Sequence, residues 1–298
     1  MGDSIWLTNT WQTAVYILAA FALIFIARHF FMFFKKGLDF KHELLEEDNF
    51  AFSISVVGYF VAVLISVGSA IVGPTHGFGL DLMFLMVYGL FSIILLTLSA
   101  GINDKFILRR FSVRKEIHKD HNAGTGVIVG ANYIASALII FGAMTGAGKD
   151  FFPDVTLGFL YSGMITAGVF WLAGQLLMVI FTWVYDLVTP YNLHDEVEKD
   201  NVAVSLAYAG MIIGVGLLIF NGVSGDFYSW EDHFMWLGIE VAIGLVLLPI
   251  IRMIVDKILL PGRNITDELV NQDKPNLGVG LIEGFAYFGG ALLIILSI

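Results

Sequence analysis

Eight apolar runs, each close to the length that crosses a bilayer, follow one another along the whole chain. A helix of about 20 apolar residues spans the hydrocarbon core, where every backbone polar group must be bonded within the segment. We therefore predict an all-α fold, a polytopic transmembrane helical bundle with eight spans. The predicted spans are about 11–34, 50–73, 80–103, 123–146, 156–186, 202–224, 233–257 and 277–297.

Composition supports this class of protein. Of the 298 residues, 57% are hydrophobic and the mean hydropathy is +0.81, values that exclude a soluble globular chain. The alternating strands of an outer-membrane barrel are not seen in the sequence. The chain has no Cys, which excludes disulfides and thiolate metal sites. Because Met1–Thr10 contains no basic residue, we expect no cleaved signal peptide.

Every second connector between the spans carries the same motif. The motif is an acidic residue, an aliphatic residue, a polar turn and an Asp, followed by an Asn that opens the next apolar run. Its copies lie at 43–51, 116–123, 196–203 and 268–276. Four copies predict four repeated helical hairpins, each made of an entering helix, a charged connector and a returning helix. Finer similarities between alternate hairpins predict two four-helix membrane halves, at 1–148 and 149–298.

This motif, followed by a helix of small residues, resembles the bacterial inner-membrane family catalogued as domain of unknown function 350. Short members of that family carry one four-helix half, so the chain resembles a tandem of two. The resemblance implies a bacterial inner-membrane location and a genomic context of membrane-stress or polyamine-related proteins. It carries no catalytic or binding residue over to this chain.

Basic residues indicate the orientation. All but one of the 16 Lys and Arg lie in or beside the charged connectors, and the exception is Lys149. The positive-inside rule therefore predicts cytoplasmic charged connectors and periplasmic termini. The connector at 104–122 is rich in bases, which suit a topology signal and contact with anionic lipid. Docking of a soluble cytoplasmic partner is the alternative, whereas the acidic net charge of -10 does not favour nucleic acid.

The returning helices carry small residues at helical spacing. Because lipid tails are as apolar as Leu, helices in a bilayer associate by close backbone approach at such residues. We expect the returning helices to pack inward and the bulkier entering helices to face lipid. A narrow glycine-lined path is the alternative. Separately, the two halves in one chain suggest fusion of an ancestral dimer, so a homo-oligomer is a further hypothesis. The GxxxG pairs are Gly126 with Gly130, Gly210 with Gly214, and Gly280 with Gly284.

Four connector acids stand where returning helices begin. They are Asp48, Asp120, Asp200 and Asp273. Together with the following Asn residues, they are suited to cap free N–H groups and to meet the positive end of a helix dipole. Capping explains them without a ligand. An acidic vestibule that gathers cations or polyamines is the alternative.

Three other acids, Asp104, Asp186 and Asp256, lie at the ends of entering helices. A carboxylate there faces the negative end of the helix dipole, which is unfavourable. We expect each to have a stabilising partner, such as an Arg or a neighbouring helix N-terminus, with a functional site as the alternative.

Glu240 and Glu283 are the strongest site candidates because they fall within predicted spans. A carboxylate at that depth costs roughly 2.5–3.5 kcal/mol on insertion scales, so it should face protein or water unless it reaches the interface. Glu283 shares a helix face with Tyr287. The first half has Tyr133 at the matching place without the acid, so the duplicated halves have diverged here.

Further polar residues within the spans include Asn132 and Gln175, for which interhelical hydrogen bonding is the simplest interpretation. The His residues form no recognisable metal-binding motif, and neither a Walker motif nor a nucleophile elbow is present. We therefore expect no metal, no cofactor and no enzymatic activity. Two hypotheses remain: a membrane scaffold or envelope-stress partner that recruits soluble proteins, and an ion channel or proton-coupled carrier of cations or polyamines.

Overall fold

The computed structural model describes residues 2–35, 39–72, 75–155, 157–259 and 261–298. Over these residues, eight helices are long and apolar enough to cross a membrane, so the predicted all-α bundle with eight spans is confirmed. They are α1 (Gly2–Phe34), α2 (Phe50–Val72), α3 (Phe78–Ile102), α5 (Ala123–Met144), α6 (Gly158–Val188), α8 (Val202–Val223), α9 (Trp230–Leu259) and α11 (Leu277–Ser297).

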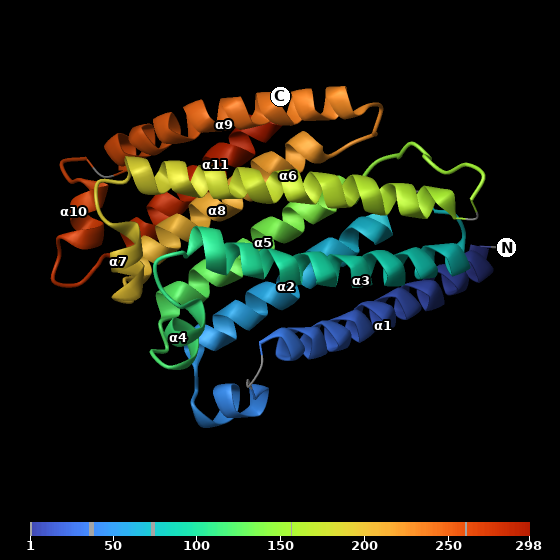
Figure 1. The fold of residues 1–298 in the computed structure, drawn as a ribbon, viewed down its shortest axis with the longest axis horizontal. Coiled ribbons are helices and arrows are strands. Elements are labelled where there is room, and N and C mark those ends of the chain that lie inside the picture. The colour runs from blue at the N-terminus through green and yellow to red at the C-terminus, as the bar shows by residue number, and fades with distance from the viewer. Residues whose placement is uncertain (1, 36–38, 73–74, 156, 260) are drawn as a thin grey trace.

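Each charged connector also contains a short helix, where the sequence had suggested only a polar turn. The short helices are η1 (His42–Glu46), α4 (Val113–His118), α7 (Leu193–Glu198) and α10 (Ile265–Val270), while η2 (Asn103–Ile107) continues α3. Ser112, Asn192 and Asn264 cap α4, α7 and α10 by accepting a bond from a first-turn N–H. The four connectors lie together at one end of the molecule, here called the connector end (Figure 1).

The eight long helices form two layers (Figure 1). The entering helices α1, α3, α6 and α9 make the front layer, and the returning helices α2, α5, α8 and α11 make the layer behind. In the returning layer, α2 packs on α5, α5 on α8, and α8 on α11, and these are the most extensive helix contacts in the molecule. The two halves therefore meet at the packed pair α5 and α8.

Glycines set the spacing within the returning layer. A Cβ atom at Gly58 would collide with the backbone of Gly130, and one at Gly210 would collide with the backbone of Gly284. Gly126 and Gly280 lie in the same way against the backbones of Ala51 and Ala203. The structure thus uses the predicted GxxxG faces for backbone-to-backbone packing of α2 on α5 and of α8 on α11.

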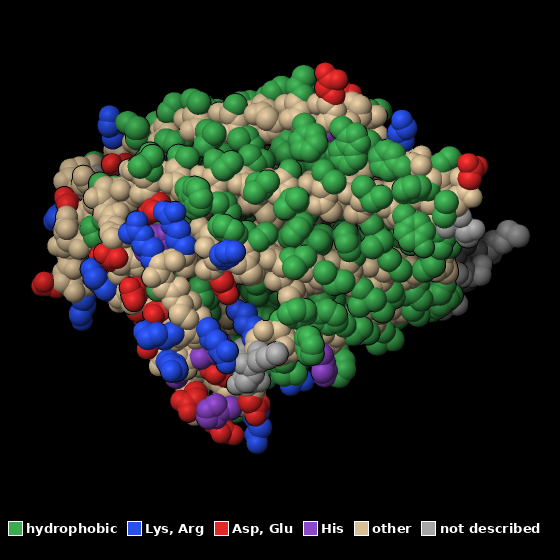
Figure 2. All heavy atoms as spheres, viewed as in Figure 1, with side chains coloured by type: hydrophobic (Ala, Val, Ile, Leu, Met, Phe, Trp, Pro, Cys, Tyr) green, Lys and Arg blue, Asp and Glu red, His purple; other side chains and the backbone are tan. Residues whose placement is uncertain are grey.

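The apolar surface belongs mainly to the helices at the outside of the bundle. Within α5 and α8, both described throughout, no large hydrophobic side chain is exposed, whereas α1 and α9 expose many. Figure 2 shows a broad apolar belt over the front layer, with acidic and basic side chains gathered at the connector end. The expected inward packing therefore holds for α5 and α8, whereas α2 and α11, at the two ends of the returning layer, expose large hydrophobic side chains as the entering helices do.

Candidate functional site

Glu283 lies on α11 and is paired with a cation from the neighbouring helix α9. Its side chain is 2% exposed, and Nε of Arg252 donates to Oε1 at 3.0 Å. The second oxygen, Oε2, is buried and has no hydrogen-bond partner among the described residues. An intramembrane carboxylate requires a partner or water, and Arg252 supplies a charged donor to one of its two oxygens.

Three tyrosines surround this pair and complete what we call the Glu283 cluster: Glu283, Arg252, Tyr185, Tyr191 and Tyr287. Tyr287 lies one turn beyond Glu283 on α11, and its ring centroid is 5.6 Å from that of Tyr185 on α6. The hydroxyls of Tyr185 and Tyr191 are buried without a partner in the described part of the chain. Tyr191 lies outside the spans, and burial together with the negative charge of Glu283 raises its pKa.

The cluster exists in the second half only. With Asp104 matched to Asp256, Ala100 stands where Arg252 is found, and Val129 stands at the place of Glu283. Tyr133 keeps the place of Tyr287 and packs edge-on against Tyr59 at 5.0 Å. Both members of the ion pair are therefore absent from the first half.

Glu240 is satisfied differently. Its side chain is 4% exposed, so it does not reach out to the interface. Nδ2 of Asn221, on α8, donates to Oε1 at 2.6 Å, and Oε2 has no described partner. The two deep carboxylates lie toward opposite ends of the second half and form separate sites.

The neutral polar candidates meet at the boundary between the halves. Nε2 of Gln175, on α6, donates to Oγ of Ser136 at 3.2 Å, and that hydroxyl in turn donates to Oδ1 of Asn132 at 3.4 Å. Nδ2 of Asn132 has no partner among the described residues. The Gln175 contact joins α6 to α5, as expected of interhelical hydrogen bonding, whereas the Asn132 contact lies within α5.

The four connector Asn residues have one role in common. Each accepts, through Oδ1, a bond from the first turn of its returning helix, and each donates Nδ2 to the Glu of its own connector. The backbone N–H donors are those of Phe52 for Asn49, Thr125 for Asn122, Val204 for Asn201 and Val279 for Asn276. The Glu partners are Glu43, Glu116, Glu196 and Glu268.

Three of these Asn residues also hold the next connector. Nδ2 of Asn49 donates to the carbonyl of Ile117 at 2.8 Å, that of Asn122 to Val197 at 2.7 Å, and that of Asn201 to Leu269 at 2.9 Å. We call these three contacts the Asn clasps. Together they join the four short helices of the connector end into one continuous platform.

The neighbouring Asp residues do not cap their own helices, which corrects that expectation. Asp48 and Asp200 adopt left-handed backbone conformations, with φ values of 46° and 59°, and place the Asn at the helix start. Oδ1 of Asp200 accepts from the N–H of Gly124 on α5 at 2.8 Å, so this acid caps the adjacent helix. Asp120 pairs with Lys115 at 2.6 Å, and Asp273 is exposed.

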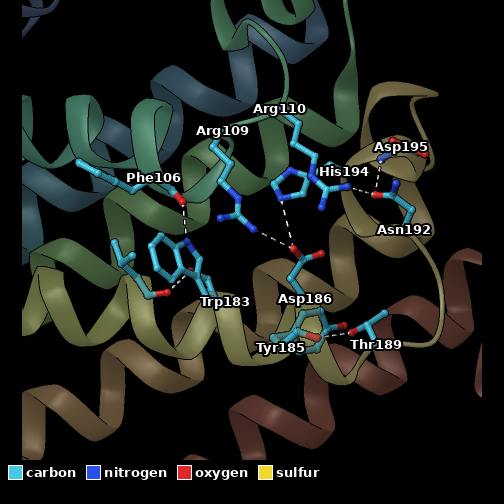
Figure 3. A network of polar contacts seen from close by, with 12 residues as sticks. Phe106, Arg109, Arg110, Trp183, Tyr185, Asp186, Thr189, Asn192, His194 and Asp195 are labelled. Carbon is cyan, nitrogen blue, oxygen red and sulfur yellow. Dashed lines mark hydrogen bonds and ion pairs between the residues drawn. The ribbon is translucent and has the colours of Figure 1, made fainter.

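The acids at the ends of entering helices have partners of the expected kind. Oδ1 of Asp256 accepts from the N–H of Ile265 at the start of α10, at 3.3 Å. Asp104 lies 4.0 Å from Nζ of Lys35. Asp186 is the centre of a larger network, shown in Figure 3.

In that network, Nη2 of Arg109 lies 3.4 Å from Asp186, and its guanidinium stacks 5.1 Å from the ring of Trp183 (Figure 3). Nε2 of His194, on α7, lies 3.8 Å from the same carboxylate. Nη1 of Arg110 donates to Asn192 at 2.9 Å. The bases of the 104–122 connector thus tie the first half to the second, a role that the sequence alone did not reveal.

Burial affects the two histidines that lie inside the platform. It lowers the pKa of His194 and also that of His118, whose Nδ1 lies 3.0 Å from Glu43. Burial also raises the pKa of Glu116, the acid that holds Asn122. In the described part of the chain, no group of three or more His, Cys, Asp or Glu is placed to hold a metal ion.

A cavity of about 550 Å³ opens at the end opposite the connectors. Residues from both halves line it, including His76, Asp81, Tyr88, Lys149 and His233. Asp81 is occupied locally, because it accepts from the hydroxyl of Thr75 at 2.6 Å and from the N–H of His76 at 2.8 Å. No local feature of the sequence marks this cavity, since it forms between loops and helix ends that are distant in the chain.

Comparison with known proteins shows to which family this chain belongs. The family model described as Domain of Unknown Function (DUF350) matches twice, at residues 5–144 and 159–298. The chain belongs to the DUF350 family. Two tandem DUF350 copies agree with the repeated hairpins, and the packed pair of α5 and α8 joins the first match to the second.

The similar proteins are described as membrane proteins. This DUF350 protein is 26% identical over 212 residues to a UPF0719 transmembrane protein of Aquifex aeolicus, a match that covers 71% of the chain and 73% of that relative. It is 22% identical over 133 residues to the UPF0719 inner membrane protein YjfL of Escherichia coli, which covers 45% of the chain and 92% of YjfL. No solved structure matches. The chain is thus a multi-pass inner-membrane protein.

Proposed function

We propose that this DUF350 protein is a non-enzymatic membrane scaffold, whose connector end faces the cytoplasm and recruits a soluble partner. The observation that carries the proposal is the continuous platform made by the three Asn clasps. The platform is held by hydrogen bonds that buried Asn side-chain amides donate. Its outer side chains are therefore presented in fixed positions, as recognition of a protein partner requires. The concentration of bases at this end supports a cytoplasmic orientation.

The returning layer supports the same proposal. Backbone contacts at Gly58 with Gly130 and at Gly210 with Gly284 leave no room for a path between those helices at these positions. A glycine-lined channel along these faces is therefore disfavoured. A scaffold needs only a rigid bundle of this kind.

One observation favours the alternative, a proton-coupled carrier of cations or polyamines. The Glu283 cluster contains three buried polar atoms without described partners: Oε2 of Glu283 and the hydroxyls of Tyr185 and Tyr191. Such atoms could bind water, a proton or a small cation at the connector end.

Flux measurements separate the two functions. Purified protein is reconstituted into liposomes, and proton and spermidine flux are recorded for the wild type, for Glu283→Gln and for Glu240→Gln. The scaffold proposal expects no flux above protein-free liposomes in any sample. Flux that Glu283→Gln abolishes and Glu240→Gln retains would replace the scaffold with a carrier.

A further inference from the structure

The Asn clasps link the four connectors in a row. In the part of the chain that the structure describes, an Asn amide at one end of the row has no connector carbonyl to bind, and at the other end a connector carbonyl receives no Asn. Asn49, Asn122 and Asn201 each reach the following connector, and their side chains are 0%, 1% and 5% exposed. Asn276 has the same cap and the same Glu partner, but among the described residues its amide reaches no carbonyl of another connector, and it is exposed. Its amide is therefore left at the edge of the platform.

At the opposite edge of the platform, formed by η1, no described Asn amide is present to donate to the connector carbonyl. The clasps end on the carbonyls of Ile117, Val197 and Leu269, and the side chains of these residues are at most 2% exposed. Each of these residues directly follows the Glu of its connector, so the equivalent residue in η1 is Leu44, whose carbonyl receives no Asn clasp in the described part of the chain. The Leu44 side chain is 36% exposed, so an aliphatic residue that is buried in three connectors faces outward in the first.

The junction between the halves shows what would complete both edges. There, Asn122 donates to Val197, and the N–H of Gly124 donates to Asp200. A Cβ atom at Gly124 would collide with the hydroxyl of Ser205, so the two helices touch at this point. The junction thus consists of two hydrogen bonds and one close contact at a glycine.

The outer edges carry the equivalent residues. Gly278 stands two residues after Asn276, as Gly124 does after Asn122, and it is exposed where Gly124 is buried. Asp48 precedes Asn49 as Asp200 precedes Asn201, with the same left-handed backbone, and its side chain is exposed. First-turn N–H groups such as that of Gly278 have no partner within their own helix.

We propose that copies of the chain assemble head to tail, with α11 of one copy packed on α2 and η1 of the next. In this interface, Asn276 donates to the Leu44 carbonyl, Gly278 donates to Asp48, and Gly278 packs on Ser53 of the neighbouring copy. The contact repeats the junction of α5 with α8. It is independent of the proposed scaffold function.

Two further features fit this interface. In a relative with a single copy, an equivalent junction can form only between two molecules, and a match of 133 residues covers 92% of YjfL. The contact is expected to be closest at the connector end, because Leu64 and Leu296 replace Gly216 and Gly142 farther along the helices. A head-to-tail contact joins different surfaces, so repetition gives a ring or a row, in which all copies keep one orientation in the membrane.

Cysteine cross-linking tests the contact directly, since the chain has no Cys of its own. A chain with Leu44→Cys and one affinity tag is co-expressed with a chain that carries Asn276→Cys and a second tag, and the membranes are oxidised. We expect a disulfide-linked dimer with both tags and little product from either variant alone. Absence of the two-tag product would overturn the proposal, provided that Asn122→Cys with Val197→Cys links within one chain. Equal homodimers from the single variants would also overturn it.

Native mass spectrometry in mild detergent gives a second measurement that does not depend on disulfide formation. The wild type is expected to contain more than one copy, and Gly278→Leu is expected to convert it to monomer. Gly238→Leu is the matched control, because a Cβ atom at Gly238 meets nothing within 4 Å and that glycine lies outside the interface. A monomeric wild type would mean that lipid covers both edges, and the proposal would fall.

Discussion

The Nε atom of Arg252 lies 3.0 Å from a carboxylate oxygen of Glu283, and each residue supplies the charge that the other needs inside the membrane. Glu283 is 2% exposed, so loss of its cation leaves a buried charge without compensation. This relationship explains why the first half, which has Val129 at the Glu283 position, also has no Arg at the Arg252 position.

Removal of Arg252 alone should therefore cost more than removal of the whole pair. We expect Arg252→Gln to lower the free energy of unfolding by about 3–5 kcal/mol, the usual cost of breaking a buried ion pair from one side. The double variant Arg252→Gln with Glu283→Gln should recover most of that loss, because neither buried charge remains. Thermal unfolding in detergent checks both values. Equal losses in the single and double variants would contradict the pairing.

Glycine packing in the returning layer gives a second prediction. Gly210→Ala places a methyl group against the backbone of Gly284, which no side-chain rotation can relieve, so we expect a loss of about 1–3 kcal/mol. Gly238→Ala, on the open face of α9, should be neutral or gain up to about 1 kcal/mol from helix propensity. Unfolding of both variants under the same conditions tests this difference. Equal stability would mean that the helices are not in backbone contact.

Much of the fold could be predicted from the sequence because its signals are local. Apolar runs of membrane length gave the eight spans, and the recurring Asn and GxxxG pairs gave the hairpins and their packing faces. The deep position of Glu283 was visible in the same way, because a charge within an apolar run stands out. Arg252 also interrupts an apolar run, but its place beside a charged connector fits a topology signal equally well.

The partners of these residues could not be predicted, since they depend on which helices lie side by side. In three of the four connector Asn residues, the side-chain amide donates a second hydrogen bond to a residue about 70 positions away, as from Asn49 to Ile117. Asp200 could be recognised as a capping residue, but the helix that it caps is α5 and not its own. The cavity at the opposite end depends on the packing of three loops and several helices from both halves.

The Asn clasp between the halves gives a third prediction. Asn122→Asp keeps the oxygen that caps α5 but removes the amide that donates to Val197, and it adds a charge 3.1 Å from a Glu116 oxygen. We expect a loss of about 1–3 kcal/mol, the cost of an unsatisfied buried acceptor. Asn192→Asp is the matched control. Its oxygen accepts from Arg110 and caps α7, so a carboxylate there should be neutral or stabilising.

The platform should also lose stability in mild acid. The pKa of His194 is lowered because the side chain is buried, and Arg110 and Arg109 add to that effect while Asp186 and Asp195 oppose it. Below the ordinary His pKa of about 6.5, the unfolded chain therefore binds a proton that the folded chain does not. Stability is then constant above about pH 6.5 and falls as the pH is lowered, by at most about 1.4 kcal/mol per pH unit for each such proton.

Since the pKa of His118 is lowered by burial as well, both histidines should contribute to this slope. We expect the melting temperature of the wild type to fall between about pH 6.5 and pH 5, His194→Gln and His118→Gln to reduce the fall, and the double variant to reduce it most. Differential scanning fluorimetry across this pH range measures it. A double variant that loses stability as steeply as the wild type would assign the pH dependence to other groups.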